Sequence, residues 1–121
     1  MEEVKNLTQE DVNEIIKRFN LEPRGRDVII TVNVIEEEDD NGVVLSTNDF
    51  SEFQYVLAKG GHVHDLEPGD KVMLNVEAMM TKVPHAENIY ESDMQIKIFP
   101  IEFEDRMYAL VSDNVIKINI K

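Results

Sequence analysis

The chain has 121 residues, of which 12 are Lys or Arg and 25 are Asp or Glu, so its formal net charge at pH 7 is -13. This excess of carboxylates repels phosphate backbones and anionic headgroups, which excludes nucleic-acid or membrane binding by simple charge attraction. A hydrophobic share of 42% suits one domain, and the lack of cysteine excludes disulfide scaffolds, thiolate zinc sites and cysteine nucleophiles.

The sequence shows no targeting or membrane segment. No run approaches the roughly 20 apolar residues that a membrane-spanning helix needs. The acidic start Met1-Glu2-Glu3 also lacks the basic and apolar regions of a signal peptide. We therefore expect a soluble protein of the cytoplasm.

The first element has the pattern of an amphipathic helix. Thr8 and Asp11 have the spacing of a capping box, and Leu7 with Val12 suits a hydrophobic staple. A helix of about three turns is expected. It carries one apolar stripe formed by Val12, Ile15, Ile16 and Phe19. We expect this stripe to pack on its own domain, and contact with a neighbouring subunit is the alternative.

Pro23 and Gly25 end the helical pattern, and β-branched residues follow. No second clear amphipathic helix appears, so the short strands predict a mainly β fold, an antiparallel sandwich or barrel. Three methionines in the strand pattern are expected in the core, namely Met73, Met94 and Met107, whereas Met79-Met80 is ambiguous. The expected strands cover residues 28–35, 42–45, 53–58, 71–76, 94–99, 107–111 and 115–120.

Enzyme signatures are absent from the sequence. There is no phosphate-binding glycine motif, no GxSxG and no HExxH, and Gly60-Gly61 is interpreted as a plain turn. The side chains that could hold a metal are His62, His64 and Asp65, with His85 and Glu87 further along. The first three lie in a turn-rich segment, so we expect exposed loop residues, no metal, no cofactor and no enzymatic activity.

An acidic run precedes an aliphatic tripeptide. Five consecutive carboxylates at residues 36–40 repel one another, which favours an extended, solvated loop. Gly42-Val43-Val44-Leu45 follows directly. These residues alone favour a buried strand, and the alternative is an exposed anchor that adds to a groove or sheet edge of another protein.

Taken in order, five segments resemble the GroES family of co-chaperonins, the lids of bacterial chaperonins. Residues 26–32 look like the first barrel strand of the family, and Gly42-Val43-Val44-Leu45 matches its mobile-loop signature. Residues 55–60 resemble the strand of the family that ends in a glycine turn, and residues 66–72 resemble its Gly-Asp turn into the next strand. Residues 108–118 resemble the C-terminal pattern of a short strand, an acidic turn and a final aliphatic strand that closes the barrel. Three features depart from the family: the N-terminal helix, the lack of a roof hairpin between Gly60 and Asp70, and the extra sequence at 76–100. These departures resemble the bacteriophage versions.

The resemblance implies a small GroES-like antiparallel β-barrel with an added N-terminal α-helix. The helical extension covers residues 1–22 and the barrel domain residues 23–121, with a mobile loop at about 36–49. The implied function is that of a co-chaperonin, a homo-oligomer and heptamer that caps a GroEL-like chaperonin ring and assists folding, for example of a phage capsid protein in the host cytoplasm. The residues implied to contact the chaperonin are Gly42, Val43, Val44 and Leu45.

A structural or decoration protein of a virion is the alternative function. In that case residues 43–45 are an ordinary strand, and the apolar stripe of the helix binds a capsid neighbour.

Overall fold

The computed structural model describes the backbone of residues 6–38, 44–84, 92–96 and 98–120, and the side chains of residues 6–35, 50–80 and 98–120. The helical elements of this part of the chain are α1 (Gln9–Ile16), α2 (Val76–Met79) and the 3-10 helix η1 (Asp113–Val115). Its strands are β1 (Asp27–Ile30), β2 (Val34–Glu38), β3 (Val44–Phe50), β4 (Phe53–Lys59), β5 (Lys71–Leu74), β6 (Met80–Pro84), β7 (Ser92–Ile96), β8 (Phe99–Phe103), β9 (Arg106–Ser112) and β10 (Ile116–Ile120).

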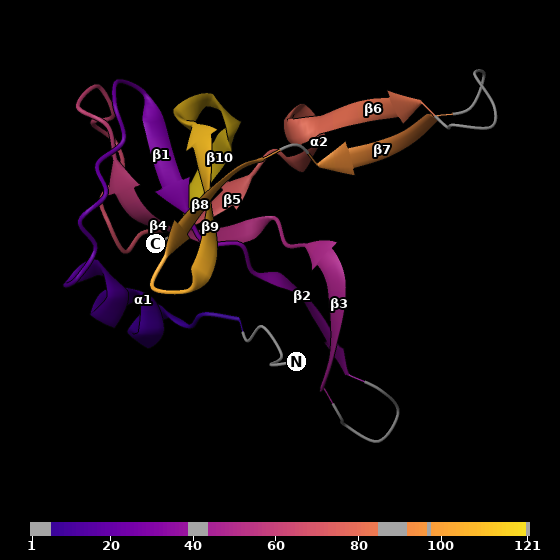
Figure 1. Cartoon of the computed structure of the whole chain (residues 1–121), viewed down its shortest axis with the longest axis horizontal. Coiled ribbons are helices and arrows are strands. Elements are labelled where there is room, and N and C mark those ends of the chain that lie inside the picture. Colours follow the sequence, from indigo (N-terminus) through magenta and orange to yellow (C-terminus); the bar gives the residue numbers. More distant parts are fainter. Residues whose placement is uncertain (1–5, 39–43, 85–91, 97, 121) are drawn as a thin grey trace.

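The main sheet is antiparallel, with the strand order β10-β5-β4-β1-β9-β8. Two separate hairpins, β2–β3 and β6–β7, project from it in different directions (Figure 1). The prediction of a mainly β antiparallel fold with an N-terminal helix is confirmed. Within the described residues, however, β8 and β10 each pair along one side only, so the sheet is not closed into a barrel.

The main sheet is covered on both faces. Successive residues of a strand point to opposite faces, and Val28, Ile29 and Ile30 of β1 are all buried. Val28 and Ile30 pack in a cluster that includes Val56, Val63, Leu66, Val72, Leu74, Met79, Ala109 and Val111. Ile29 packs on the other face with Val12, Ile15, Leu57 and Tyr108. The second cluster requires α1 as its cover.

The N-terminal helix begins where the sequence predicts it. The hydroxyl of Thr8 accepts a hydrogen bond from the Asp11 backbone N–H at 3.3 Å, and the Asp11 carboxylate accepts one from the Thr8 N–H at 3.0 Å. This capping box satisfies two N–H groups at the helix start. Val12 and Ile15 are buried against the sheet, and Leu7 packs against the same cluster. The helix therefore packs on its own domain, as expected.

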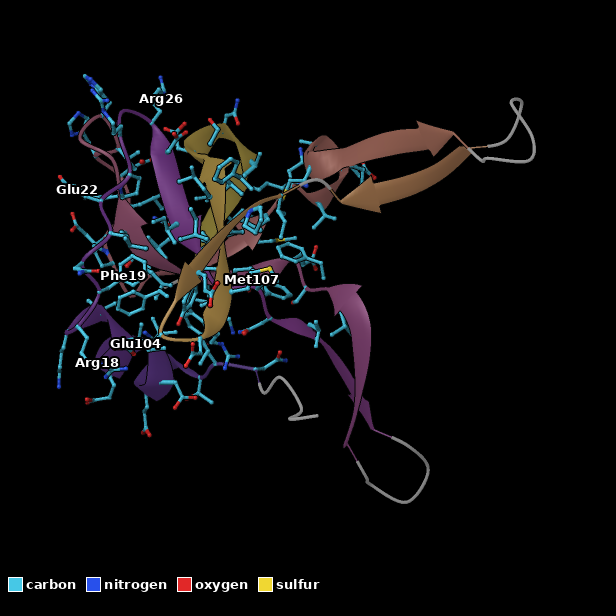
Figure 2. The ribbon with its side chains drawn as sticks, viewed as in Figure 1. Arg18, Phe19, Glu22, Arg26, Glu104 and Met107 are labelled. Carbon is cyan, nitrogen blue, oxygen red and sulfur yellow. The ribbon has the colours of Figure 1, made fainter. Side chains whose placement is uncertain are left out.

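The helix ends at Ile16, so it is shorter than the three turns expected from the sequence. The residues that follow it contact the turn between β8 and β9. The ring of Phe19 lies 4.7 Å from that of Phe103 and 5.9 Å from that of Tyr108, measured between centroids. Arg18 pairs with Glu104 at 2.9 Å, and this hydrogen-bonded guanidinium lowers the pKa of the Glu104 carboxyl (Figure 2). Both charged groups are about half exposed, so the aromatic contacts contribute more to docking. The division of the chain at residue 22 stays a prediction, although helix and sheet share one apolar cluster.

Other features differ from the expectations. The sequence predicts strand residues over 28–35 without placing a break among them, whereas β1 and β2 lie in different sheets and are separated by residues 31–33. Strands β6 and β8 and the one-turn helix α2 are not predicted.

The methionines are placed as follows in the described residues. Met79 is buried in α2, and Met73 is half-buried in β5. The expectation that Met107 is in the core is wrong: it is 55% exposed, because it lies at the turn end of β9 opposite exposed Glu102. Met94 has its side chain outside the described residues.

Candidate functional site

The candidate site is the β2–β3 hairpin, called the arm below. It projects from the body of the molecule and belongs to no larger sheet in the described part of the chain (Figure 1). Four residues are implied to contact a chaperonin. Val44 and Leu45 are the first two residues of strand β3. Gly42 and Val43 lie outside the described residues.

In the backbone ladder of the arm, two glutamates lie opposite the two aliphatic residues Val44 and Leu45. Glu38 lies opposite Val44 in the antiparallel ladder, and Glu37 lies opposite Leu45. The segment expected to be a loop, residues 36–49, thus includes the end of β2 and most of β3, and these two strands pair with each other. A two-stranded hairpin is only marginally stable in water by itself, so the order of the arm depends on how its base is held.

A buried glutamine of β4 holds the base of the arm. The Oε1 of Gln54 accepts hydrogen bonds from the Thr31 hydroxyl at 2.7 Å and the Asn33 N–H at 2.8 Å. Its Nε2 donates to the carbonyls of Asn33 and Ser51, at 2.9 and 2.8 Å. The Thr31 hydroxyl in turn accepts from the Tyr55 N–H at 3.0 Å. Every hydrogen-bonding position of this fully buried amide is used, which makes the site rigid and favourable rather than costly.

Two asparagines join the N-terminal segment to the same base. Asn6 accepts from the Val34 N–H at 2.9 Å and donates to the Val34 carbonyl at 2.7 Å. Asn33 does the same for Leu7, accepting from its N–H and donating to its carbonyl, both at 3.0 Å. We call these four hydrogen bonds the asparagine clamp. It places the start of β2 next to the start of α1.

An open hollow of about 560 Å³ lies beside the base of the arm. Ile35 and Phe53 at its rim are 41% and 40% exposed. Apolar surface next to the arm is therefore accessible to a partner. The hollow is lined by Asn6, Val34, Ile35, Phe50, Ser51, Glu52, Phe53 and Val76.

The histidines considered for metal binding lie apart from the arm, on the loop after β4. His62, His64 and Asp65 are exposed there, whereas His85 and Glu87 lie outside the described residues. In the described ranges, no group of three or more His, Cys, Asp or Glu side chains is placed to hold a metal ion.

The sequence did not identify the residues that hold the arm. Gln54 and Asn33 are polar residues within runs of strand-forming residues, and that interruption was the available signal. Asn6 carries no local signal, because its partner Val34 lies 28 residues away in the sequence.

The chain matches no protein-family model and no curated protein sequence. None of the helices in the described part of the chain has the length and apolar character needed to cross a bilayer. Function is therefore inferred from the arm, its base and the edges of the sheet.

Replacing Gln54 with leucine tests the role of the buried amide. Gln54→Leu keeps a side chain of similar size but leaves buried groups of Thr31, Asn33 and Ser51 without this partner. Each buried group left unsatisfied costs about 1–3 kcal/mol, so we expect the free energy of unfolding in urea to fall by about 3 kcal/mol or more. The control Asn20→Leu removes an exposed amide and should change the free energy of unfolding by less than about 1 kcal/mol. Equal losses in both variants would contradict the role given to Gln54.

Hydrogen exchange should separate the arm from the sheet. Backbone amides of β2 and β3 should exchange faster than those of β1, because the arm has two strands while β1 is central and buried on both faces. Exchange followed by mass spectrometry measures this difference in the free protein. Protection of β2 equal to that of β1 would rule out the arm as an independently opening unit.

Proposed function

We propose that this protein is a GroES-type co-chaperonin that caps a chaperonin ring through the tip of the arm. One observation carries the proposal: Val44 and Leu45 begin β3 at the far end of a hairpin that projects from a compact sheet (Figure 1). The order of the five segments that resemble the family supports it further. The protein acts by binding rather than by catalysis, and its partner is a GroEL-like ring in the cytoplasm, that of the host if a phage encodes it.

The energetics of the arm favour repeated, releasable contacts. Full burial of one Val or Leu side chain at a partner is worth about 1.5–3 kcal/mol. Any ordering of backbone and side chains on contact opposes binding, so two aliphatic side chains give one arm only weak binding. Several arms on one ring act at a high effective concentration after the first has engaged, which gives useful avidity from weak contacts. Weak individual contacts also permit release.

A ring requires an interface between copies, and two exposed apolar sites offer one. The edge strand β10 carries Ile118 and Ile120, which are 50% and 38% exposed. Leu21 is 36% exposed beside an open hollow of about 360 Å³. Because the two sites differ, contact between them is head-to-tail and can close into a ring, a heptamer by the resemblance. Exposed Lys117 on β10 and exposed Glu22 at the hollow have opposite charges. The hollow is lined by Leu21, Glu22, Pro23, Arg24, Asp27, Ile29, Ile101 and Leu110.

The alternative function, a structural or decoration protein of a virion, uses the apolar stripe of α1 to bind a capsid neighbour. Val12 and Ile15 of that stripe are buried against the sheet of the same chain. They are not free for a neighbour, and we therefore favour the co-chaperonin function.

Substituting both aliphatic residues of the arm tests the proposed contact. The double variant Val44→Ser, Leu45→Ser should lose capping, measured by pull-down with a GroEL-type chaperonin and ATP. Its melting temperature should barely change, because the arm lies outside the main sheet. The control Asn48→Ser, on the same strand, should retain capping. Intact capping in the double variant would refute the contact, and a collapsed melting temperature would show that the two residues are core positions.

Charged substitutions on β10 test the ring. Ile118→Asp with Ile120→Asp should convert the ring to monomers in native mass spectrometry, because two buried carboxylates oppose association. The control Met107→Asp changes an apolar residue that is at least as exposed, at 55%, but lies outside both sites, and it should leave the ring intact. A ring that survives the double change would exclude this interface, and a monomeric unmodified protein would exclude the ring.

A further inference from the structure

The N-terminal segment connects the arm directly to α1. The asparagine clamp holds Asn6 and Leu7 against Asn33 and Val34 with four hydrogen bonds of 2.7–3.0 Å. The next residue, Thr8, is already the N-cap of the helix. Because no linker separates clamp and helix, displacement of one must strain the other.

The helix is fixed to the sheet by contacts that do not involve the clamp. Val12 is completely buried and Ile15 nearly so. The side chain of Gln9 donates to the Gly69 carbonyl at 2.8 Å, on the turn before β5. The helix therefore provides a firm support from which the clamp can hold β2.

The arm depends on such a support. Both backbone polar groups of Val34, the first residue of β2, bond to the side chain of Asn6. Both backbone polar groups of Leu7 bond to the side chain of Asn33, which Gln54 fixes through its main chain. The clamp is thus reciprocal, with each segment supplying one side chain and one backbone residue.

We propose that the asparagine clamp couples α1 to the arm, so that docking of the helix and order of the arm rise and fall together. Coupling between two sites is reciprocal. A partner that holds the arm strengthens the docking of α1, and a partner that displaces α1 loosens the arm. Where the arm is the chaperonin contact, which rests on the function proposed above, the N-terminal helix regulates that contact.

The test measures hydrogen exchange at residues 36–38 of β2 in a cycle of two substitutions. Ile16→Ala weakens helix docking without removing a fully buried side chain. Asn6→Ala removes the two bonds to Val34 and should speed exchange in β2 roughly tenfold, with β1 unchanged. Ile16→Ala should speed exchange in β2 severalfold when Asn6 is present and clearly less in the Asn6→Ala background, where only the two Asn33–Leu7 bonds of the clamp remain. Exchange in α1 should also rise in Asn6→Ala.

Two results would overturn the coupling: no effect of Ile16→Ala on β2, or the same effect in both backgrounds. The control Asn20→Ala removes an exposed asparagine four residues beyond the C-terminal end of α1 and should leave exchange in β2 unchanged. If Asn6→Ala does not fold, Asn6→Gln keeps both the amide donor and the amide acceptor but displaces them by one methylene, so it should give a smaller acceleration. The cycle uses the protein without a chaperonin. Failure of capping would therefore refute the proposed function without affecting the coupling between α1 and the arm. An exchange rate of β2 that does not respond to Ile16→Ala would refute the coupling without affecting the proposed function.

Discussion

The amide of Gln54 determines where the chain can leave the main sheet. Residues 31–33 follow β1 but lie in no strand, and buried backbone groups without partners would be costly there. Gln54 takes the place of a neighbouring strand by bonding the N–H and the carbonyl of Asn33. With Asn33 fixed, its own side chain is free to bond Leu7, which brings the N-terminal segment to the arm. The arm, the clamp and the entry to α1 therefore meet at Asn33, which Gln54 fixes together with the Ser51 N–H, a second donor to the same carbonyl at 3.0 Å.

Local sequence patterns were sufficient to predict most of the main sheet. Runs of β-branched and aromatic residues indicated β1, β4, β5, β9 and β10 within a few residues. In β1, β4, β5 and β9 buried positions select such side chains, and β10 packs its partly buried Ile116 against the core. They could not show that residues 28–35 form two strands. The β-branched character continues through Val32, Val34 and Ile35, and what ends β1 is a side chain more than 20 residues away.

The edge of the sheet was harder to predict than its centre. Pro100 lies inside β8, and a proline within a strand pattern argues against a central strand. The residue is tolerated because β8 is an edge strand, where one side of the ladder is not required. For the candidate site, the motif Gly42-Val43-Val44-Leu45 stays a prediction of the contact residues, whereas the spacing of Thr8 and Asp11 correctly predicted the helix cap. The residues that hold the base of the arm were not predicted. The side-chain amides of Asn6, Asn33 and Gln54 form hydrogen bonds with residues 21 to 28 positions away in the sequence, and such bonds leave no periodic pattern.

A fixed base changes the balance of forces for any partner of the arm. A segment that folds entirely on contact gives up several kcal/mol of its interaction energy to ordering, whereas an arm whose base is held by Gln54 and the clamp gives up less, because part of it is ordered beforehand. Even so, two aliphatic side chains contribute about 3–6 kcal/mol at most, which corresponds to dissociation constants from about 6 mM to about 40 µM. A single arm is therefore insufficient for stable capping. The exposed edge of β10 then becomes as necessary for the proposed function as the arm, because only assembly of several copies can raise such weak contacts to a useful affinity.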